Sequence, residues 1–326
     1  MHKTLIALTL LAAQASAAPL FSDDIAAGKQ PLTYLGKDSK AATTLLLTQK
    51  ADGGDAVARI AADSPVTILL VDDKGHALVK NAFGLTGWAQ ADTSGAAADK
   101  LDGLQKVVIG EDAFIFYHDP KNSTFLNEIA SGKDEEPETY RALRGKLAGD
   151  DQDYFVYCDD GMSGDPSCTI FPVPADGKAP TETTYDKNRT LNGETYYLPG
   201  DGTVYTDTQA NLFYQTRSKY TLKGDKLDEV IQPYQYIGVD SKAESAFTLD
   251  GLDGKKHKVK KGEKVRVILD DPRAIPCNPE TDSCNKLKLL VQNAAGDAGW
   301  VTVVDAYGGD DGKPGPKIEY IRFYGD

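Results

Sequence analysis

The stretch LVKNAFGLTGW (Leu78–Trp88) returns in altered form as LVQNAAGDAGW (Leu290–Trp300), and these two segments hold the only two tryptophans of the chain. Upstream, QPLTYLGKDSKA (Gln30–Ala41) matches QPYQYIGVDSKA (Gln232–Ala243) in the same way. Two matched blocks in the same order indicate one small module that is present twice, around an unrelated centre.

The chain has 326 residues, which is enough for two or three domains that each bury a core. We define the first copy as residues 30–92, the central region as residues 104–231 and the second copy as residues 232–305. Residues 306–326 are predicted to form a C-terminal strand or tail.

Apolar residues alternate along the middle of each copy, which is typical of a half-buried strand. In the first copy the alternating residues are Val66, Ile68 and Leu70, and in the second they are Val265, Val267 and Leu269. The alternation predicts that each set of three shares one face. Tight turns separate these short strands, and no helical stretch interrupts them, which favours a small barrel.

The endings Gly84–Trp88 and Gly296–Trp300 resemble the closing Gly-x-x-Gly-Trp of the bacterial SH3-like (SH3b) domain. The resemblance covers Val57–Gln90 and Val259–Val303. Lys261–Val267 fits the usual Gly-x-x-Val strand entry, whereas the first copy departs from it, and the opening strand typical of the family is recognisable in neither copy. The resemblance implies two small SH3-like β-barrels.

The central region is predicted to be rich in β-strands, with a closing hairpin at 218–230. Glu136–Leu147 is the one predicted helix, because it starts with acidic residues and Pro137 and ends with basic ones. The predicted fold class is therefore mainly β: two small SH3-like β-barrels that flank a β-rich central domain with one helix.

Residues 1–17 are predicted to be a cleaved signal peptide. Lys3 precedes the apolar run Leu5–Ala13, and Ala15–Ala17 is an A-x-A cleavage site. The run is too short to span a bilayer, so no membrane insertion is expected. The sequence thus predicts a periplasmic or secreted protein.

The chain carries 49 acidic and 36 basic residues, a net charge of −13. Such a chain is repelled by nucleic acid, so no nucleic-acid partner is expected. The excess of acid serves solubility or attracts a cationic partner. One cluster, Lys255–Lys261, is basic; it could grip a polyanion, or it could be the lysine-protected edge of a sheet.

The four cysteines form two local pairs, Cys158 with Cys168 and Cys277 with Cys284. In an exported chain an even count predicts disulfides, and the short polar segments between the partners favour the local pairing. A zinc site is the alternative, but CxxC spacing and neighbouring histidines are missing.

Four repeated aromatic residues are the candidate binding residues: Trp88, Trp300, Tyr34 and Tyr236. They could form a ligand-facing aromatic floor, or each could fill a small core. Three acidic loops could hold calcium, around Asp159–Asp165, Asp186–Glu194 and Asp310-Asp311, but solvated turns explain them equally. No metal and no cofactor are predicted.

No catalytic residue is predicted, because His76, His118 and His257 lie in different parts of the chain and no nucleophile motif accompanies them. We therefore expect a non-enzymatic exported binding protein. By the resemblance, its partner is a peptidoglycan peptide or an envelope protein. The alternative is a structural or inhibitor-like protein whose acidic central domain docks on a cationic partner protein.

Overall fold

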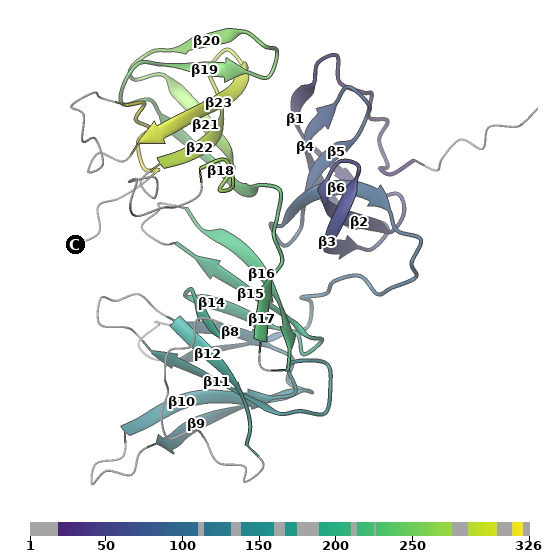
Figure 1. The fold of residues 1–326 in the computed structure, drawn as a ribbon, viewed down its shortest axis with the longest axis vertical. Helices are drawn as coiled ribbons and strands as arrows, with labels where there is room; N and C mark the ends of the chain where they lie inside the picture. The colour runs from purple at the N-terminus through teal and green to yellow at the C-terminus, as the bar shows by residue number, and fades with distance from the viewer. Residues whose placement is uncertain are drawn as a thin grey trace, which may run out of the picture.

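The computed structural model is all β in the part of the chain that it describes, with four sheets and no helix there. Figure 1 shows the first copy in purple and the second copy in green to yellow side by side, with the teal central region at the other end of the molecule. The predicted mainly-β class is confirmed. The described residues are 19–109, 114–131, 138–159, 167–174, 189–209, 214–224, 226–275, 286–304 and 315–321. Within these ranges nothing helical has the length and apolar character to cross a membrane.

The two copies have one topology. The strand order is β1-β4-β5-β6-β2-β3 in the first copy and β18-β21-β22-β23-β19-β20 in the second, position for position the same. In the first copy the strands are β1 (Leu32–Lys40), β2 (Leu45–Lys50), β3 (Gly53–Ile60), β4 (Pro65–Asp72), β5 (Ala77–Asn81) and β6 (Thr86–Ala91). In the second they are β18 (Gln235–Lys242), β19 (Phe247–Gly251), β20 (Lys256–Val259), β21 (Lys264–Asp270), β22 (Lys286–Gln292) and β23 (Ala298–Val304).

Both copies contain the same bulge in their first strand. The pairing register shifts directly after Tyr34 in the first copy and directly after Tyr236 in the second. Gly36 and Gly238 lie inside these bulges at φ angles of 57° and 69°. A Cβ at either glycine would run into the tyrosine ring two residues earlier. The repeated Tyr-x-Gly is therefore one packing unit in which only glycine fits.

A second shared bulge reverses the side chains of the central strand. The register of β4 shifts between Ile68 and Leu70, so Ile68 points into the core of the first copy while Leu70 joins Leu69 in a different cluster. The second copy repeats this between Val267 and Leu269. Our period-two prediction is wrong at Leu70 and Leu269, because a one-residue shift moves a side chain to the opposite face. Each copy thereby gains a second apolar face.

The matched Asn-Ala-x-Gly segments form the same turn twice. The side-chain Oδ1 of Asn81 and that of Asn293 each accept backbone N–H bonds from the residues two and four positions later, at 3.0 and 2.9 Å in both copies. Gly84 and Gly296 complete the turns at φ angles of 89° and 91°. These side-chain acceptors reinforce the backbone turn, in which the Gly84 and Gly296 amides donate to the Asn81 and Asn293 carbonyls at 3.1 and 3.0 Å. This explains why the asparagine recurs.

The described strands of each copy form an open sheet. The end strands, β1 and β3 in one copy and β18 and β20 in the other, are not joined by a ladder of hydrogen bonds. Residues of β2, β3, β4, β5 and β6 nevertheless share one hydrophobic cluster in the first copy, so the sheet curls around its own core. The closed barrel that the resemblance implies is not seen in this part of the chain.

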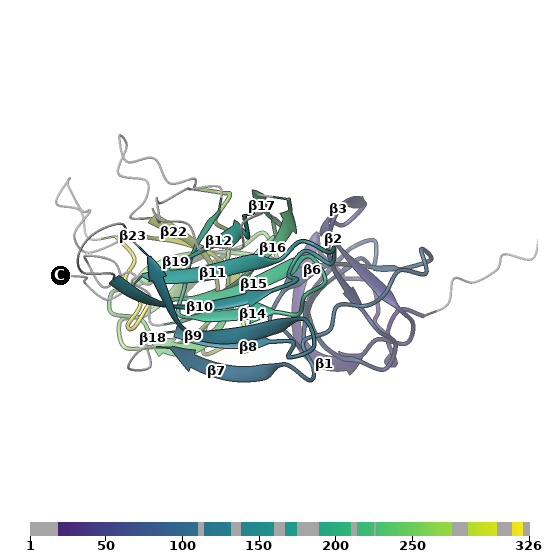
Figure 2. The same cartoon turned by 90° about the horizontal axis from the view of Figure 1, so that it is seen from below.

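The central region is a two-layer sandwich. One sheet has the order β13-β12-β11-β10-β9 and the other β17-β16-β15-β14-β8-β7. Figure 2 shows the strands of the two sheets lying over one another, and their buried side chains form one cluster. The first sheet contains β9 (Ser123–Ser131), β10 (Glu138–Gly145), β11 (Tyr154–Asp159), β12 (Ser167–Pro172) and β13 (Thr190–Asn192). The second contains β7 (Gln105–Ile109), β8 (Phe114–His118), β14 (Thr195–Leu198), β15 (Thr203–Thr208), β16 (Thr216–Lys223) and β17 (Lys226–Glu229).

The predicted helix at Glu136–Leu147 is wrong, because Glu138–Gly145 is the strand β10, paired with β9 on one side and β11 on the other. Leu143, Gly145 and Leu147 are buried and the residues between them are not. That period of two belongs to a sheet. Charged residues and a proline favour a helix only weakly, and the hydrogen bonds that β10 makes with a strand on each side outweigh that preference.

Candidate functional site

The four predicted binding residues all lie where the two copies meet. In the first copy, Tyr34, Leu70, Leu78 and Trp88 are consecutive cross-strand partners over β1, β4, β5 and β6. The equivalent strands of the second copy carry a second such row: Tyr236, Leu269, Leu290 and Trp300. Both rows belong to one hydrophobic cluster. We call this contact the junction.

The junction has the character of an isologous interface, because equivalent positions of the two copies belong to one hydrophobic cluster. Leu70 and Leu78 are fully buried there, and so are Leu269 and Leu290. The second bulge turns Leu70 and Leu269 away from the core of their own copy. Leu78 and Leu290 point to the junction by the ordinary alternation of β5 and β22, since their neighbours on both sides lie in the core of their copy. Burying the four side chains removes large apolar surfaces from water and holds the copies together.

The aromatic residues of the rows are buried or half-buried in the junction. Trp88 is 8 % exposed, whereas Tyr34, Tyr236 and Trp300 are half-buried. Lys80 Nζ of the first copy sits 4.8 Å above the Tyr236 ring of the second, and the Trp300 ring lies 5.5 Å from that of Tyr234 in its own copy. Burial raises the pKa of Tyr34. This packing supports the structural role that the sequence left open.

Polar contacts extend the junction to the central region. Gln232 accepts the N–H of Thr86 at 2.8 Å and donates to the carbonyl of Arg217 at 2.7 Å. The Thr86 hydroxyl donates to the Tyr234 carbonyl. One buried glutamine thus joins all three parts, so the repeated Gln-Pro of the second copy has a contact that the sequence does not reveal.

Two largely buried ion pairs lie where the six-stranded sheet of the central region meets the first copy and the segment 93–103 that follows it. Arg217 makes a bidentate pair with Asp207, at 2.6 and 2.5 Å, and donates to the Phe83 carbonyl. Lys219 Nζ lies 2.5 Å from Asp99, and both side chains are at most 13 % exposed. Buried charges of this kind mark active sites or structural contacts. Here each cation has its own carboxylate, which identifies a structural contact.

A pocket of about 650 Å³ opens beside the second copy. It lies where β18 and β21 meet the segment Gly315–Ile321 near the C-terminus. None of the four aromatic residues of the rows lines it. Its lining is Asp240, Ser241, Lys242, Lys264, Val265, Arg266, Gln292, Asn293, Ala294, Glu319 and Tyr320.

Side chains of both charges face this pocket. Arg266 Nη1 lies 3.2 Å from Asp240, while Lys242 and Lys264 add two further cations to the lining. The first copy has Pro65 and Thr67 at the positions of Lys264 and Arg266, as the strand pairings show. Cations at these two positions are therefore a property of the second copy alone.

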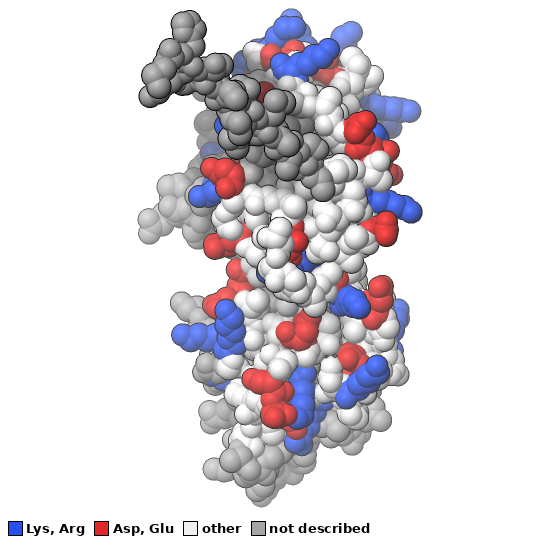
Figure 3. All heavy atoms as spheres, turned by 90° about the vertical axis from the view of Figure 1, so that its right-hand side faces the viewer, with Lys and Arg blue, Asp and Glu red and all other residues white. Residues whose placement is uncertain are grey.

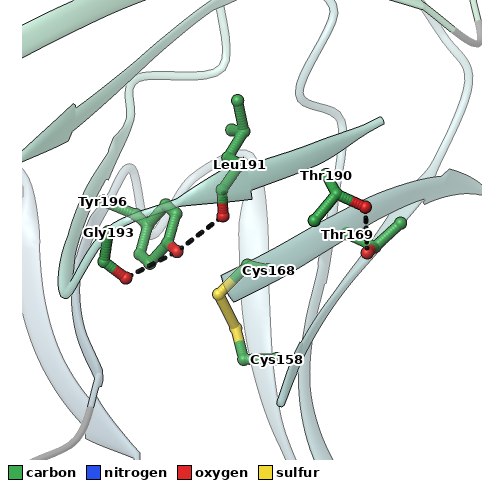
Figure 4. The surroundings of a disulfide bond; sticks show 7 residues. All are labelled: Cys158, Cys168, Thr169, Thr190, Leu191, Gly193 and Tyr196. Atoms are coloured by element: carbon green, nitrogen blue, oxygen red, sulfur yellow. Dashed lines mark hydrogen bonds between the residues drawn. A yellow bond between two sulfur atoms is a disulfide. The ribbon is translucent and has the colours of Figure 1, made fainter. Parts of the chain in front are cut away.

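The predicted disulfide Cys158–Cys168 is confirmed. The two cysteines are directly paired residues of β11 and β12. Figure 4 shows Tyr196 close by, with its hydroxyl donating to the carbonyls of Leu191 and Gly193 at 3.0 and 2.7 Å. The bridge fastens this end of the sandwich.

The three histidines stay apart, as predicted. His76 lies 2.7 Å from Asp72, and His257 lies 2.8 Å from Asp253. The buried His118 contacts the Ser123 hydroxyl at 2.7 Å, and burial lowers the pKa of its imidazole. That hydroxyl donates to the Asp119 carbonyl, so its proton points away from the ring. The pair closes a turn and does not resemble an activated nucleophile.

Other predictions fall wholly or partly outside the described residues, namely the signal peptide at residues 1–17, the Cys277–Cys284 pair, the three acidic loops and the C-terminal strand or tail at residues 306–326. In the described ranges, no three side chains of His, Cys, Asp or Glu gather in a way that could hold a metal. Lys255–Lys261 surrounds β20, the edge strand of its sheet, which supports the protected-edge interpretation. On the face drawn in Figure 3, acidic and basic side chains are interspersed.

Comparisons with known proteins add no relative. No protein-family model, no curated protein and no solved structure matches the chain.

Proposed function

We propose that this is a non-enzymatic, exported binding protein built on two SH3-like copies, and that the pocket of the second copy takes its ligand. The equal topology of the copies, with Gly-x-x-Gly-Trp entering β6 and β23, supports the SH3-like assignment. In this assignment we take the strands β2 and β19 as the opening strand that is not recognisable in the sequence. The disulfide is compatible with an oxidising compartment outside the cytoplasm.

The pocket is the observation that carries the proposal. It is concave, and cations and carboxylates converge on it, which is what orients a peptide with charges of both signs. A peptidoglycan stem peptide has this chemistry, because it carries several carboxylates and a free amine. The partner proposed from the resemblance therefore fits the pocket better than it fits the aromatic rows, which pack within the junction.

Retention on insoluble peptidoglycan, at low and high salt, tests this function. We expect the wild-type protein to bind and the double variant Lys264→Ala, Arg266→Ala to bind ~10-fold more weakly or worse, since each lost charge-assisted hydrogen bond costs ~1.5–3 kcal/mol. Pro65→Ala with Thr67→Ala is the control at the equivalent positions of the first copy, where no loss is expected. Wild-type protein that is not retained, or a pocket variant that binds like the control, contradicts the proposal.

The alternative function is a structural or inhibitor-like role for the acidic central region. It rests on the net charge of −13. On the face shown in Figure 3 the acids do not form a separate patch. Capture of a cationic envelope protein that persists in the pocket variant would favour this alternative.

A further inference from the structure

The two ends of the described chain dock at the same place on the two copies. Phe21 bridges to Ala41 of the first copy, and Ile318 bridges to Ala243 of the second, both in antiparallel fashion. Ala41 and Ala243 are equivalent, since each directly follows the repeated Asp-Ser-Lys. We call this position the slot, and residues 315–321 the C-terminal latch.

The backbone hydrogen bonds of the two slots correspond one to one. In the first copy the Ser22 amide donates to the Lys40 carbonyl, and the Ala42 amide donates to the Leu20 carbonyl, both at 2.9 Å. In the second copy the same two bonds run from Glu319 to Lys242 and from Glu244 to Lys317, again at 2.9 Å. Both segments therefore pair with the chain directly after β1 and β18 through one antiparallel bridge each, with two flanking hydrogen bonds.

Each docked segment buries a large apolar side chain at the bridge. Phe21 is 6 % and Ile318 is 5 % exposed, and each belongs to the hydrophobic core of its copy. The C-terminal latch buries a second one, Ile321. An acidic residue comes two positions after Phe21 and one position after Ile318: Asp23, paired with Lys37 at 3.6 Å, and Glu319, which lines the pocket beside Lys242.

The docked sequences, Leu20-Phe21-Ser22 and Lys317-Ile318-Glu319, are otherwise unrelated. A slot that accepts two unrelated segments from opposite ends of a chain selects for extended backbone and one apolar anchor. These are the requirements of peptide recognition by strand addition, in which main-chain bonds supply affinity and a side-chain pocket supplies selectivity.

We propose that the slot of the second copy is a peptide-docking site that the C-terminal latch fills in cis. An extended segment of a partner protein, with a large apolar residue followed by an acidic one, replaces the latch there. The proposal applies to the second copy, because there the latch also forms one wall of the pocket. A partner segment in place of the latch would therefore lie beside Lys242, Lys264 and Arg266. The inference does not depend on wall binding, since it concerns the edge of the sheet beneath the latch.

The first test uses the full chain with Ile318→Asp, which disables its own latch, and a fluorescent peptide with the sequence of residues 315–321. The variant is expected to bind the peptide, and the wild-type chain to bind it ~10-fold more weakly or worse, because a tethered competitor has a high effective concentration. The same peptide carrying Ile318→Asp is the control and should not bind. If circular dichroism shows that the variant is folded and it still does not bind the peptide, the proposal is overturned.

The second test uses the unaltered protein, so it does not rely on the variant folding. With a large excess of the peptide, hydrogen exchange should accelerate at the Glu319 amide of the latch, while the Glu244 amide stays protected because the peptide replaces its acceptor. Exchange at Glu319 that stays unchanged overturns the proposal. Retention on peptidoglycan is measured separately, so failure of the proposed function and failure of this inference are distinguishable.

Discussion

The first and second copies share their backbone irregularities and differ in the surfaces around them. Both have the glycine bulge under a tyrosine, the asparagine turn and the row of four residues at the junction. Lys264 and Arg266 occur only in the second copy, and the ion pair of Asp99 with Lys219 lies beside the first. Duplication thus keeps what the backbone and the junction require, while the rest of each surface is available for another task.

The largest effect is expected from breaking the junction. Leu78→Ala and Leu290→Ala should each lower the free energy of unfolding by ~2–5 kcal/mol, because both side chains are fully buried. Denaturant unfolding followed by tryptophan fluorescence reports on this contact, since Trp88 and Trp300 are the only tryptophans and both lie in it.

If the two rows are in contact, the effects of Leu78→Ala and Leu290→Ala will not be additive. The loss in the free energy of unfolding of the double variant will then differ from the sum of the two single losses. The control combines Leu78→Ala with Leu143→Ala in the central sandwich, where the two losses should add. Simple additivity for Leu78 and Leu290 would show that the rows do not share a contact.

Removing the disulfide should destabilise the central region and leave the two copies unaffected. Cys158→Ala with Cys168→Ala is expected to lower stability by ~2–3 kcal/mol, from the closed loop of 10 residues. Far-ultraviolet circular dichroism should show the central strands melting earlier, while the tryptophan emission of the folded protein stays the same. A shift of that emission would contradict this prediction, because it would mean that the junction depends on the disulfide.

The bulge glycines sharpen the comparison between the copies. Gly36→Ala and Gly238→Ala should lower the free energy of unfolding by the same amount. The left-handed backbone accounts for ~1–2 kcal/mol of it, and displacement of the tyrosine ring adds a further loss. Gly84→Ala is the control, since a Cβ there meets nothing within 4 Å. Equal thermal shifts for Gly36→Ala and Gly84→Ala would show that the ring contact contributes nothing.

The smallest effect is a pH dependence of stability that arises from Asp72 in the first copy. Burial raises the pKa of Asp72, but hydrogen bonds from the His76 side chain and from the His76 and Lys74 amides outweigh it, so the pKa is lowered. The folded pKa then lies below the unfolded one. The resulting stabilisation is complete above the unfolded value and is lost as the pH falls through the folded value. Asp72→Asn should flatten the acid side of the stability curve, and an unchanged curve would contradict this.

The sequence predicts the duplication, the β class and the Cys158–Cys168 bridge, because these depend on local patterns. It does not predict the junction, which pairs residues about two hundred positions apart through a bulge that period-two alternation cannot show. One signal was available. The apolar run Ile68–Val71 is continuous, as is Val267–Leu269, and continuous runs are typical of strands that are buried on both faces.

The predicted helix failed for a related reason. Its charges and proline are local, whereas the pairing of β10 with β9 and β11 is not. The Asp99–Lys219 pair, 120 residues apart in the chain, likewise leaves no local trace. Sequence patterns here describe the parts of the molecule and not the contacts between them.

The junction also sets an order of events during synthesis. The first row is complete once Trp88 is made, but its counterpart ends at Trp300, near the end of the chain. Until then the emerging polypeptide presents a strip of leucine and aromatic side chains without its cover. Such a strip is a binding surface for chaperones and a risk for association between neighbouring nascent chains.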